Sequence, residues 1–532
     1  MYDFLIIGGT VVDGTGAERI TADVGIKDGK IAAIGTLKGE AAKETIDATG
    51  KIVAPGFIDY HSHSDLTILM RFGAQNMLEQ GITTEVAGHC GHSISPLIPP
   101  DFAAIQSKIA PDAQERLDKT DGSTKAVMAE IERQLLPTNF AYYLGHGAIR
   151  GKVMGYEDRK PTADEMAKMK EYICEGMEAG AMGFSTGLIY PPGSYSDTEE
   201  LIELCKVVAE YGGHYTTHMR SEGNKVVQSV EEALRIGKEC NVPVIISHKK
   251  IFGKHNEKKS EQTLALAEQA RKTGQKVYFD QYPYDGGATS LFSGLPPSYA
   301  SQGIDRLAEN LKDKKVRAEL AELLSKDSND FENLIFLSTP DGVIVSGIEA
   351  EPELNGMTLA EIARQKNNDV YETLFDLLIE NRELMAIFRM INPWDIDNIM
   401  KSPYTMGGTD AAQYPREEMK KTHPRFIGTF PKIIGQYCRE KGLFSLEECI
   451  RKLTLLPAQV AGFTQKGQLA QGKDADIVVF DYDKIDGKST YGNIVPNDGI
   501  DYVFVNGVLA VKDGVCTGNN GGTLLRRTPS VK

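Results

Sequence analysis

Short apolar runs separated by tight glycine turns characterise both ends of the chain. They lie in FLIIGGTVVDGTG, ADVGIKDGKIAAIG and ETIDATGKIVAPG near the N-terminus, and in GQLAQGKDADIVVFD and DYVFVNGVLAVKDGV near the C-terminus. Asp-Gly between β-rich runs is a strong signal for a hairpin. Because the pattern occurs at both ends, we predict one small β-sandwich domain built from residues 1–53 and 465–532.

Between these ends, helical and strand patterns alternate. Thr162 and Glu165 have the spacing of a capping box before a helical run, and Ser196 and Glu199 have it before the next. Eight strands are predicted here, near residues 54–60, 82–88, 140–145, 183–187, 214–220, 243–250, 276–284 and 404–410. Repeated βα units imply a parallel sheet, and eight of them favour a closed (β/α)8 TIM-type barrel over residues 54–464.

The barrel pattern has one long interruption. The stretch between YPYDGG and YTMGGTD is longer than one connecting helix requires, and it opens with the glycine- and proline-containing GGATSLFSGLPPSYASQG. Long insertions after a barrel strand lie on the catalytic face and often cover it. We therefore expect residues 286–350 to form a lid-like insertion, with helices after it.

The bulk properties of the 532 residues exclude some classes of partner. A formal net charge of −15 argues against a nucleic acid. No apolar stretch reaches the length of about 18 residues that suggests a membrane helix, so we expect no membrane association. The seven cysteines are scattered rather than arranged as a disulfide framework, which favours a reducing, cytoplasmic location. The oligomeric state stays open.

A pair of histidines ends the first predicted barrel strand. In GFIDYHSHSD, His61 and His63 are two residues apart, so on a strand they point to the same side. Neutral imidazole is a common zinc ligand. An H-x-H pair alone is weak support for a metal site, since two polar residues at a strand end are common.

Other predicted strands end in polar residues, several of them of types that can bind metals or substrates. These are Cys90 with His89 and His92, then Tyr190, His218, His248 with Lys250, Asp280 with Tyr282, and Asp410. Taken singly, a histidine can be a core residue, a cysteine a buried apolar one, and an aspartate a helix N-cap. Active sites of barrels lie at the carboxyl ends of the strands. Several ligand types at corresponding ends of separate βα units therefore predict a common metal centre.

This arrangement resembles the amidohydrolase superfamily, many members of which carry a bridging carboxylated lysine on strand 4. Here that strand reads GFSTG, without lysine, and Cys90 looks like the substitute used by the N-acyl-D-amino-acid deacylases, the D-aminoacylases. Further segments similar to that family are GFSTGLIYPPGSY, THMRSEG, VPVIISHKK, FDQYPY and HPRFIGTFPKIIGQY. The segments HSHSD, GHCGHS and GGTDA differ from the motifs that are usual at these positions in that family. The resemblance covers almost the whole chain.

The resemblance implies a zinc enzyme and assigns its ligands. Cys90, His218 and His248 would hold one zinc ion tightly. His61, His63 and Asp410, with Cys90 as a bridge, would form a second, weaker site. Asp410 would also be the catalytic base, taking a proton from water and passing it to the leaving amine.

The implied reaction is hydrolysis of a small-molecule N-acyl-D-amino acid to a carboxylate and a free D-amino acid. Arg425 and Lys250 are candidates for binding the substrate α-carboxylate, with Tyr190 and Tyr282 as hydroxyl donors. Lys249 and His92 are weak indications of an acidic D side chain. Three alternatives remain: a cyclic amidase of the dihydropyrimidinase type, which would normally need the strand 4 lysine, a deaminase, and a non-catalytic scaffold.

Overall fold

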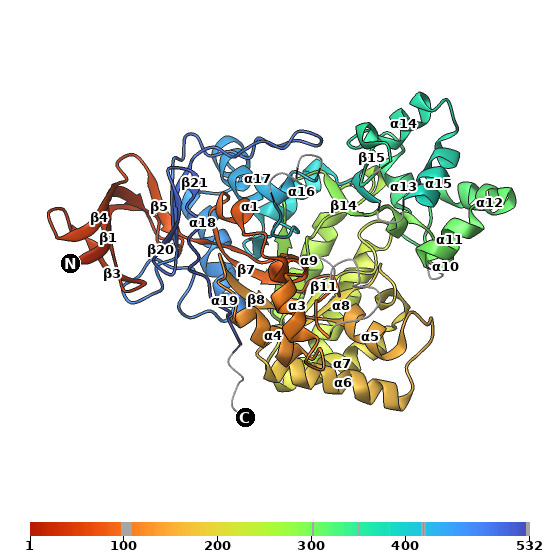
Figure 1. The fold of residues 1–532 in the computed structure, drawn as a ribbon, viewed down its shortest axis with the longest axis horizontal. Coiled ribbons are helices and arrows are strands. Elements are labelled where there is room, and N and C mark those ends of the chain that lie inside the picture. The colour runs from red at the N-terminus through yellow and green to blue at the C-terminus, as the bar shows by residue number, and fades with distance from the viewer. Residues whose placement is uncertain are drawn as a thin grey trace.

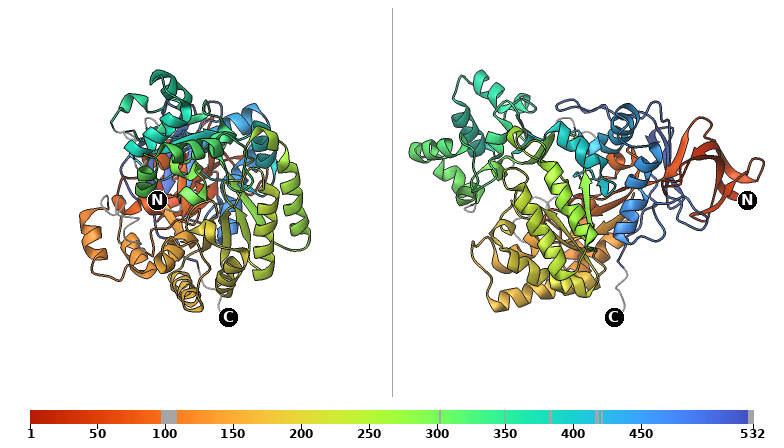
Figure 2. Two further views of the ribbon diagram at one scale, coloured as in Figure 1. Left: turned by 90° about the vertical axis from the view of Figure 1, so that its right-hand side faces the viewer. Right: turned by 180° about the vertical axis from the view of Figure 1, so that it is seen from behind.

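The structure is a computed structural model that describes residues 1–96, 109–300, 303–348, 350–381, 384–415, 419 and 422–527. Figure 1 shows three parts: a sheet that contains both the red N-terminal strands and the dark blue C-terminal ones, a central barrel, and a green insertion. The sheet and the insertion lie at opposite ends of the molecule in Figure 1 and in the right-hand view of Figure 2.

Strands from the two chain ends form one hydrogen-bonded sheet. They are β1 (Tyr2–Val11), β2 (Ile20–Lys27), β3 (Lys30–Gly35), β4 (Ala42–Asp47), β5 (Ile52–Pro55), β18 (Ile477–Phe480), β19 (Ile500–Val505), β20 (Val508–Lys512) and β21 (Val515–Cys516). Their order is β21-β20-β19-β18-β5-β1-β2-β3, with β4 on β1. The antiparallel pair β5–β18 joins the two ends. The predicted pairing of the termini is confirmed, as one continuous sheet.

The Asp-Gly hairpin signal is also confirmed at the β2–β3 turn. Asp28 and Gly29 have φ of 50° and 76°, the left-handed conformation that a two-residue hairpin turn requires. Strand β5 extends the sheet to residue 55, two residues beyond the expected boundary. We propose that the sheet and the barrel are separate domains, divided near residues 55 and 465.

Eight parallel strands close into a barrel. They are β6 (Phe57–Asp59), β7 (Ile82–Ala87), β8 with β9 (Asn139–Tyr142 and Leu144–Gly145), β10 (Gly183–Gly187), β11 (His214–His218), β12 (Val244–Ile246), β13 (Val277–Gln281) and β17 (Thr405–Gly407). At the seam between β6 and β17, the Tyr60 N–H donates to the Gly407 carbonyl at 3.1 Å. At the junction of β8 and β9, the Tyr143 N–H donates to the Ala87 carbonyl at 2.8 Å. The predicted barrel is confirmed, strand by strand.

Helices connect and follow these strands. They are α1 (Gln75–Leu78), α3 (Pro111–Leu117), α4 (Thr124–Glu132), α5 (His146–Met154), α6 (Ala163–Glu178), α7 (Thr198–Glu210), α8 (Val226–Cys240), α9 (Lys259–Lys272), α16 (Pro393–Lys401), α17 (Arg425–Lys432) with its π-helical continuation η8 (Ile433–Glu440), α18 (Leu446–Leu453) and α19 (Leu455–Ala461). The apolar stripe of α6 is buried, as its periodicity predicts.

One of the two expected capping boxes forms. Thr162 and Glu165 cap α6 reciprocally. The box predicted at Ser196 is wrong, because the neighbouring Asp197 accepts the Glu200 N–H at 2.9 Å and caps α7 instead. The Ser196 hydroxyl donates to the Gly193 carbonyl at 2.7 Å. Two adjacent capping residues compete for one helix start, and the carboxylate is the stronger acceptor.

The insertion after β13 is longer than expected. It contains the antiparallel sheet β14-β16-β15 (Gly286–Ser290, Met385–Arg389, Val343–Ser346) and the helices α10 (Pro297–Ala300), α11 (Ile304–Asn310), α12 (Lys314–Leu324), α13 (Leu334–Ser338), α14 (Leu359–Gln365) and α15 (Val370–Glu380). The predicted end at residue 350 is therefore wrong. Strand β16 pairs with β14, so the insertion ends only after residue 389.

No helix in the described part of the chain is both long enough and apolar enough to span a membrane.

Candidate metal centre

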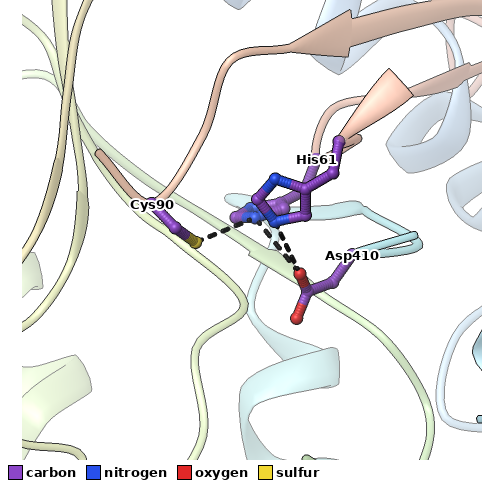
Figure 3. Close-up of side chains that lie close together, drawn as sticks. His61, Cys90 and Asp410 are labelled. Carbon is purple, nitrogen blue, oxygen red and sulfur yellow. Dashed lines mark hydrogen bonds and ion pairs between the residues drawn. The ribbon is translucent and has the colours of Figure 1, made fainter. Parts of the chain in front are cut away.

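The predicted ligands meet at the mouth of the barrel. Two groups of side chains place their donor atoms within 4.8 Å of one another, namely His61, His63, Cys90 and Asp410 in one group and Cys90, His218 and His248 in the other. Figure 3 shows His61, Cys90 and Asp410 reaching toward a common point from three separate segments. Because Cys90 belongs to both groups, its thiol lies between them.

The Cys90 side chain is positioned by a loop that packs on the end of strand 4. The Ser185 hydroxyl on β10 donates to the Gly88 carbonyl at 2.6 Å and accepts the Gly91 N–H at 3.2 Å. A Cβ added at Gly187 would lie only 2.0 Å from the Cys90 carbonyl oxygen. The cysteine loop thus fills the space at the end of β10, where a strand 4 lysine would otherwise project.

Three of the predicted ligands have a strained backbone. Cys90, His248 and Asp410 have φ of 55°, 34° and 51°, in the left-handed region that side chains rarely adopt. The His248 N–H donates to Asp280 Oδ1 at 2.6 Å, and the Asp410 N–H donates to the His61 carbonyl at 2.8 Å. Such strain persists where the surrounding structure enforces it, typically at functional sites.

The electrostatics of the centre suit a bound cation. Burial lowers the pKa of His61, His218 and His248 well below the ordinary value, so these imidazoles are neutral and ready to act as ligands. Within the part of the chain that the structure describes, neither ring nitrogen of the buried His218 makes a hydrogen bond. Burial raises the pKa of the Cys90 thiol well above its usual value, so a cation is needed to hold it as thiolate.

The donor set fits zinc. One thiolate with two imidazoles leaves an open position, as in catalytic zinc sites. The second group, with two imidazoles and a carboxylate, also offers donors that zinc accepts. Burial alone would raise the pKa of Asp410, but the Arg425 guanidinium and the hydrogen bond from His63 hold it well below its usual value, so this residue is an anion.

Glu222 lies behind the histidines and was not predicted. This buried carboxylate accepts from Lys250 Nζ at 2.9 and 2.8 Å. It also lies 3.3 Å from His248 Nδ1 and 3.5 Å from His218 Nε2. In the sequence, Glu222 could have been identified by its position four residues after His218, in the segment THMRSEG. Glu222 thus fixes the Lys250 ammonium, which in turn contacts His248 Nδ1, and it lies close to the ring of His218.

Two further residues support His61. Asp280 Oδ1 lies 2.9 Å from His61 Nδ1, and both side chains are buried. The ring of His89 stacks on His61 with centroids 4.1 Å apart. The sequence placed Asp280 and His89 at strand ends but assigned neither a role. Together they hold the His61 ring so that Nε2 faces Cys90 Sγ at 3.4 Å and Asp410.

A cavity of about 250 Å³ opens on this centre. Its lining includes all four predicted substrate-binding residues, Tyr190, Lys250, Tyr282 and Arg425. The insertion contributes an apolar wall of Leu334, Met385, Phe388 and Met390. The site is therefore enclosed between the barrel mouth and the insertion sheet.

Lys249 and His92 do not supply the positive charge that the sequence hinted at. Lys249 is fully buried and is not among the residues that line the cavity, and burial lowers its pKa to about 7. His92 lines the cavity, but burial lowers its pKa to about 4, so its ring is neutral at pH 7. The indication of an acidic D side chain therefore loses both of its supports.

Replacing Glu222 with glutamine is expected to weaken zinc binding by about 10- to 100-fold, the usual effect of removing an outer partner of ligand histidines. The amide keeps the shape but lacks the charge that holds Lys250. Zinc affinity is measured by competition with a chelator. Glu257→Gln, on the exposed segment before α9, should bind zinc as the unchanged protein does. Equal affinities in all three proteins would exclude this role for Glu222.

A (β/α)8 barrel with histidine, cysteine and aspartate ligands at the carboxyl ends of its strands defines the class of metal-dependent hydrolases. Comparison with known proteins agrees. The profile of the Amidohydrolase family matches residues 44–511. The D-aminoacylase of Alcaligenes xylosoxydans xylosoxydans is 35% identical over 99% of this chain and 98% of its own. The N-acyl-D-glutamate deacylase of the same organism is 34% identical over 99% and 97%.

A solved structure shows the same likeness. The N-acyl-D-glutamate deacylase of Bordetella bronchiseptica, complexed with zinc and a phosphonate inhibitor that mimics the tetrahedral intermediate, aligns with a TM-score of 0.81. It is 33% identical, and the alignment covers 99% of each chain. This chain therefore belongs to the amidohydrolase family, in its branch of N-acyl-D-amino-acid deacylases.

Proposed function

We propose that this chain is a zinc-dependent enzyme that hydrolyses the amide bond of N-acyl-D-amino acids to a carboxylate and a free D-amino acid. The observation that carries the proposal is the complete set of ligands around Cys90, next to a cavity that also contains the Arg425 guanidinium. The relatives named above support it. A cyclic amidase would lack its strand 4 lysine here, and a non-catalytic scaffold would have no reason to keep every ligand.

The chain would hold zinc through Cys90, His218 and His248, with His61, His63 and Asp410 as a second, weaker group. Zinc supplies Lewis acidity, which makes an amide carbonyl more electrophilic and water a better nucleophile. We assign Asp410 as the general base. Its carboxylate accepts a proton from the attacking water and delivers it to the leaving amine nitrogen.

The substrate carboxylate is assigned to Arg425. Its guanidinium lines the cavity and has the planar geometry that grips a carboxylate. Lys250 is a weaker candidate than the sequence indicated, because both carboxylate oxygens of Glu222 already accept hydrogen bonds from its ammonium. Tyr190 and Tyr282 line the same cavity as hydroxyl donors. The insertion is assigned as a lid, because its apolar wall excludes water from the reacting groups.

The direct test of this function is a panel of N-acetyl-D-amino acids and their L enantiomers, assayed with protein of known zinc content. The D substrates should be hydrolysed, and removing zinc with a chelator should abolish turnover. Two anchors, at the reacting carbonyl and at the α-carboxylate, fix the α-carbon so that only one enantiomer directs its side chain into the cavity. Equal rates for D and L substrates would contradict the proposal.

Substituting Arg425 with methionine should lower kcat/KM for an N-acetyl-D-amino acid by roughly tenfold to a hundredfold, since a charge-assisted hydrogen bond contributes about 1.5–3 kcal/mol. An α-amide substrate lacks the carboxylate and serves as the comparison. The loss should be much smaller for that substrate. If both substrates lose the same factor, Arg425 has a structural role and does not bind the carboxylate.

A further inference from the structure

A buried ion pair links the proposed base to the proposed carboxylate-binding residue. Arg425 Nη1 lies 2.8 Å from Asp410 Oδ2, and the two residues are 5% and 7% exposed. The other oxygen, Asp410 Oδ1, lies 3.1 Å from His63 Nε2. The guanidinium therefore contacts the carboxylate of the second ligand group, on the side opposite its histidine partner.

Several contacts hold the guanidinium in this place. Arg425 Nη2 donates to the Ala288 carbonyl of the insertion at 3.3 Å. The guanidinium carbon lies 5.1 Å from the centroid of the Tyr282 ring. At the backbone, the Arg425 N–H donates to His423 Nδ1 at 3.0 Å. The arginine is thus fixed by strand β14, by the barrel and by its own helix start.

The two ligand groups differ in how their neighbouring cations are balanced. Lys250 lies beside His248, but it is neutralised by Glu222, which is not a predicted ligand. Arg425 is neutralised by Asp410, which is itself a predicted ligand. Asp280 does not distinguish the groups, because Oδ1 contacts both His61 and the His248 N–H. The carboxylate charge that would attract a second metal ion is therefore already compensated by the protein.

We propose that Arg425 acts as a built-in cation at Asp410 and thereby lowers the affinity of the second ligand group for a metal ion. A guanidinium stays charged at every pH at which proteins fold. Like charges a few ångström apart repel strongly where water and salt do not screen them. In the group of Cys90, His218 and His248, the cation next to a ligand is Lys250, and Glu222 rather than a ligand balances its charge, so this group keeps its affinity.

The inference also gives Arg425 two successive roles. Before a substrate binds, the guanidinium pairs with Asp410. When the α-carboxylate of a substrate also pairs with the guanidinium, the interaction with Asp410 weakens, and Asp410 becomes a better proton acceptor for the attacking water. This second role rests on the proposed function, whereas the weakening of the second metal site does not.

Zinc titration of the metal-free protein tests the inference without any substrate. Calorimetric titration should show one tight equivalent and a much weaker second one in the unchanged protein. Arg425→Gln and Arg425→Met remove the charge, the first with a hydrogen-bond donor retained and the second without one. Both should bind the second equivalent at least tenfold more tightly. Arg425→Lys keeps the charge and should behave as the unchanged protein does.

Thermal unfolding of each variant identifies those that fold, and one folded neutral variant is sufficient. Two equally tight zinc ions in the unchanged protein would overturn the inference. So would a second-site affinity that is the same in the neutral variants and in Arg425→Lys. If the protein binds zinc as expected but hydrolyses no N-acyl-D-amino acid, the proposed function fails while the inference about Arg425 stands.

Discussion

Replacement of Cys90 by alanine is expected to abolish both zinc binding and turnover. The thiol belongs to both ligand groups, so its loss leaves neither complete. Lewis-acid assistance contributes several kcal/mol of transition-state stabilisation, so kcat should fall on the order of a thousandfold or more. Metal analysis of the purified protein and the rate with an N-acetyl-D-amino acid measure the two effects. Cys174→Ala, a half-buried cysteine on α6, should lose neither.

The same cysteine predicts how zinc uptake depends on pH. Burial holds the Cys90 pKa above its usual value, so the metal-free thiol is protonated at neutral pH and below. Zinc must displace that proton, and its apparent affinity should therefore rise with pH.

A Cys90→Ala protein with full zinc content and full turnover would contradict the assignment of Cys90 as a zinc ligand.

Replacement of Asp410 by asparagine is the second change with a large expected effect. The amide keeps the shape of the carboxylate but cannot accept the proton from water. A positioned base typically contributes about 10²- to 10⁴-fold, so kcat should fall by that order. Zinc at Cys90, His218 and His248 should be retained, because Asp410 does not belong to that group.

Two measurements separate loss of the base from loss of the fold. Asp410→Asn leaves the buried Arg425 without its ion-pair partner, so thermal unfolding should show reduced stability. Asp397→Asn on α16 breaks a partly exposed ion pair with Lys441 away from the centre and should keep its kcat. A near-normal kcat in Asp410→Asn would exclude Asp410 as the base.

Much of the candidate site could be predicted because a barrel makes sequence position informative. Each βα unit places the carboxyl end of its strand at the same mouth, so residues at corresponding positions, such as His218 and His248, must lie close together. The spacing of His61 and His63 predicted that both point to the same side, and in the structure both lie just beyond the end of β6 and belong to the same ligand group. These inferences need only local periodicity and the topology that it implies.

Other features depended on contacts that no local pattern encodes. Strand β16 belongs to the insertion because it pairs with β14, which lies far away in sequence. Of two adjacent lysines, Lys250 reaches Glu222 and lines the cavity, whereas Lys249 is buried in the core. Neighbouring side chains of the same type differ only in the direction that the folded backbone gives them.

The sequence by itself predicted the barrel and the pairing of the chain termini, because these follow from hydrophobic periodicity and strand order, and the resemblance to the D-aminoacylases added the proposed zinc ligands. The tertiary structure alone decided how charge is distributed around those residues. The pairing of Arg425 with Asp410 and of Lys250 with Glu222 joins groups from different elements, selected by burial. Unpaired charges are costly inside a protein, so packing determines which partners meet and therefore which ligands remain available to a metal.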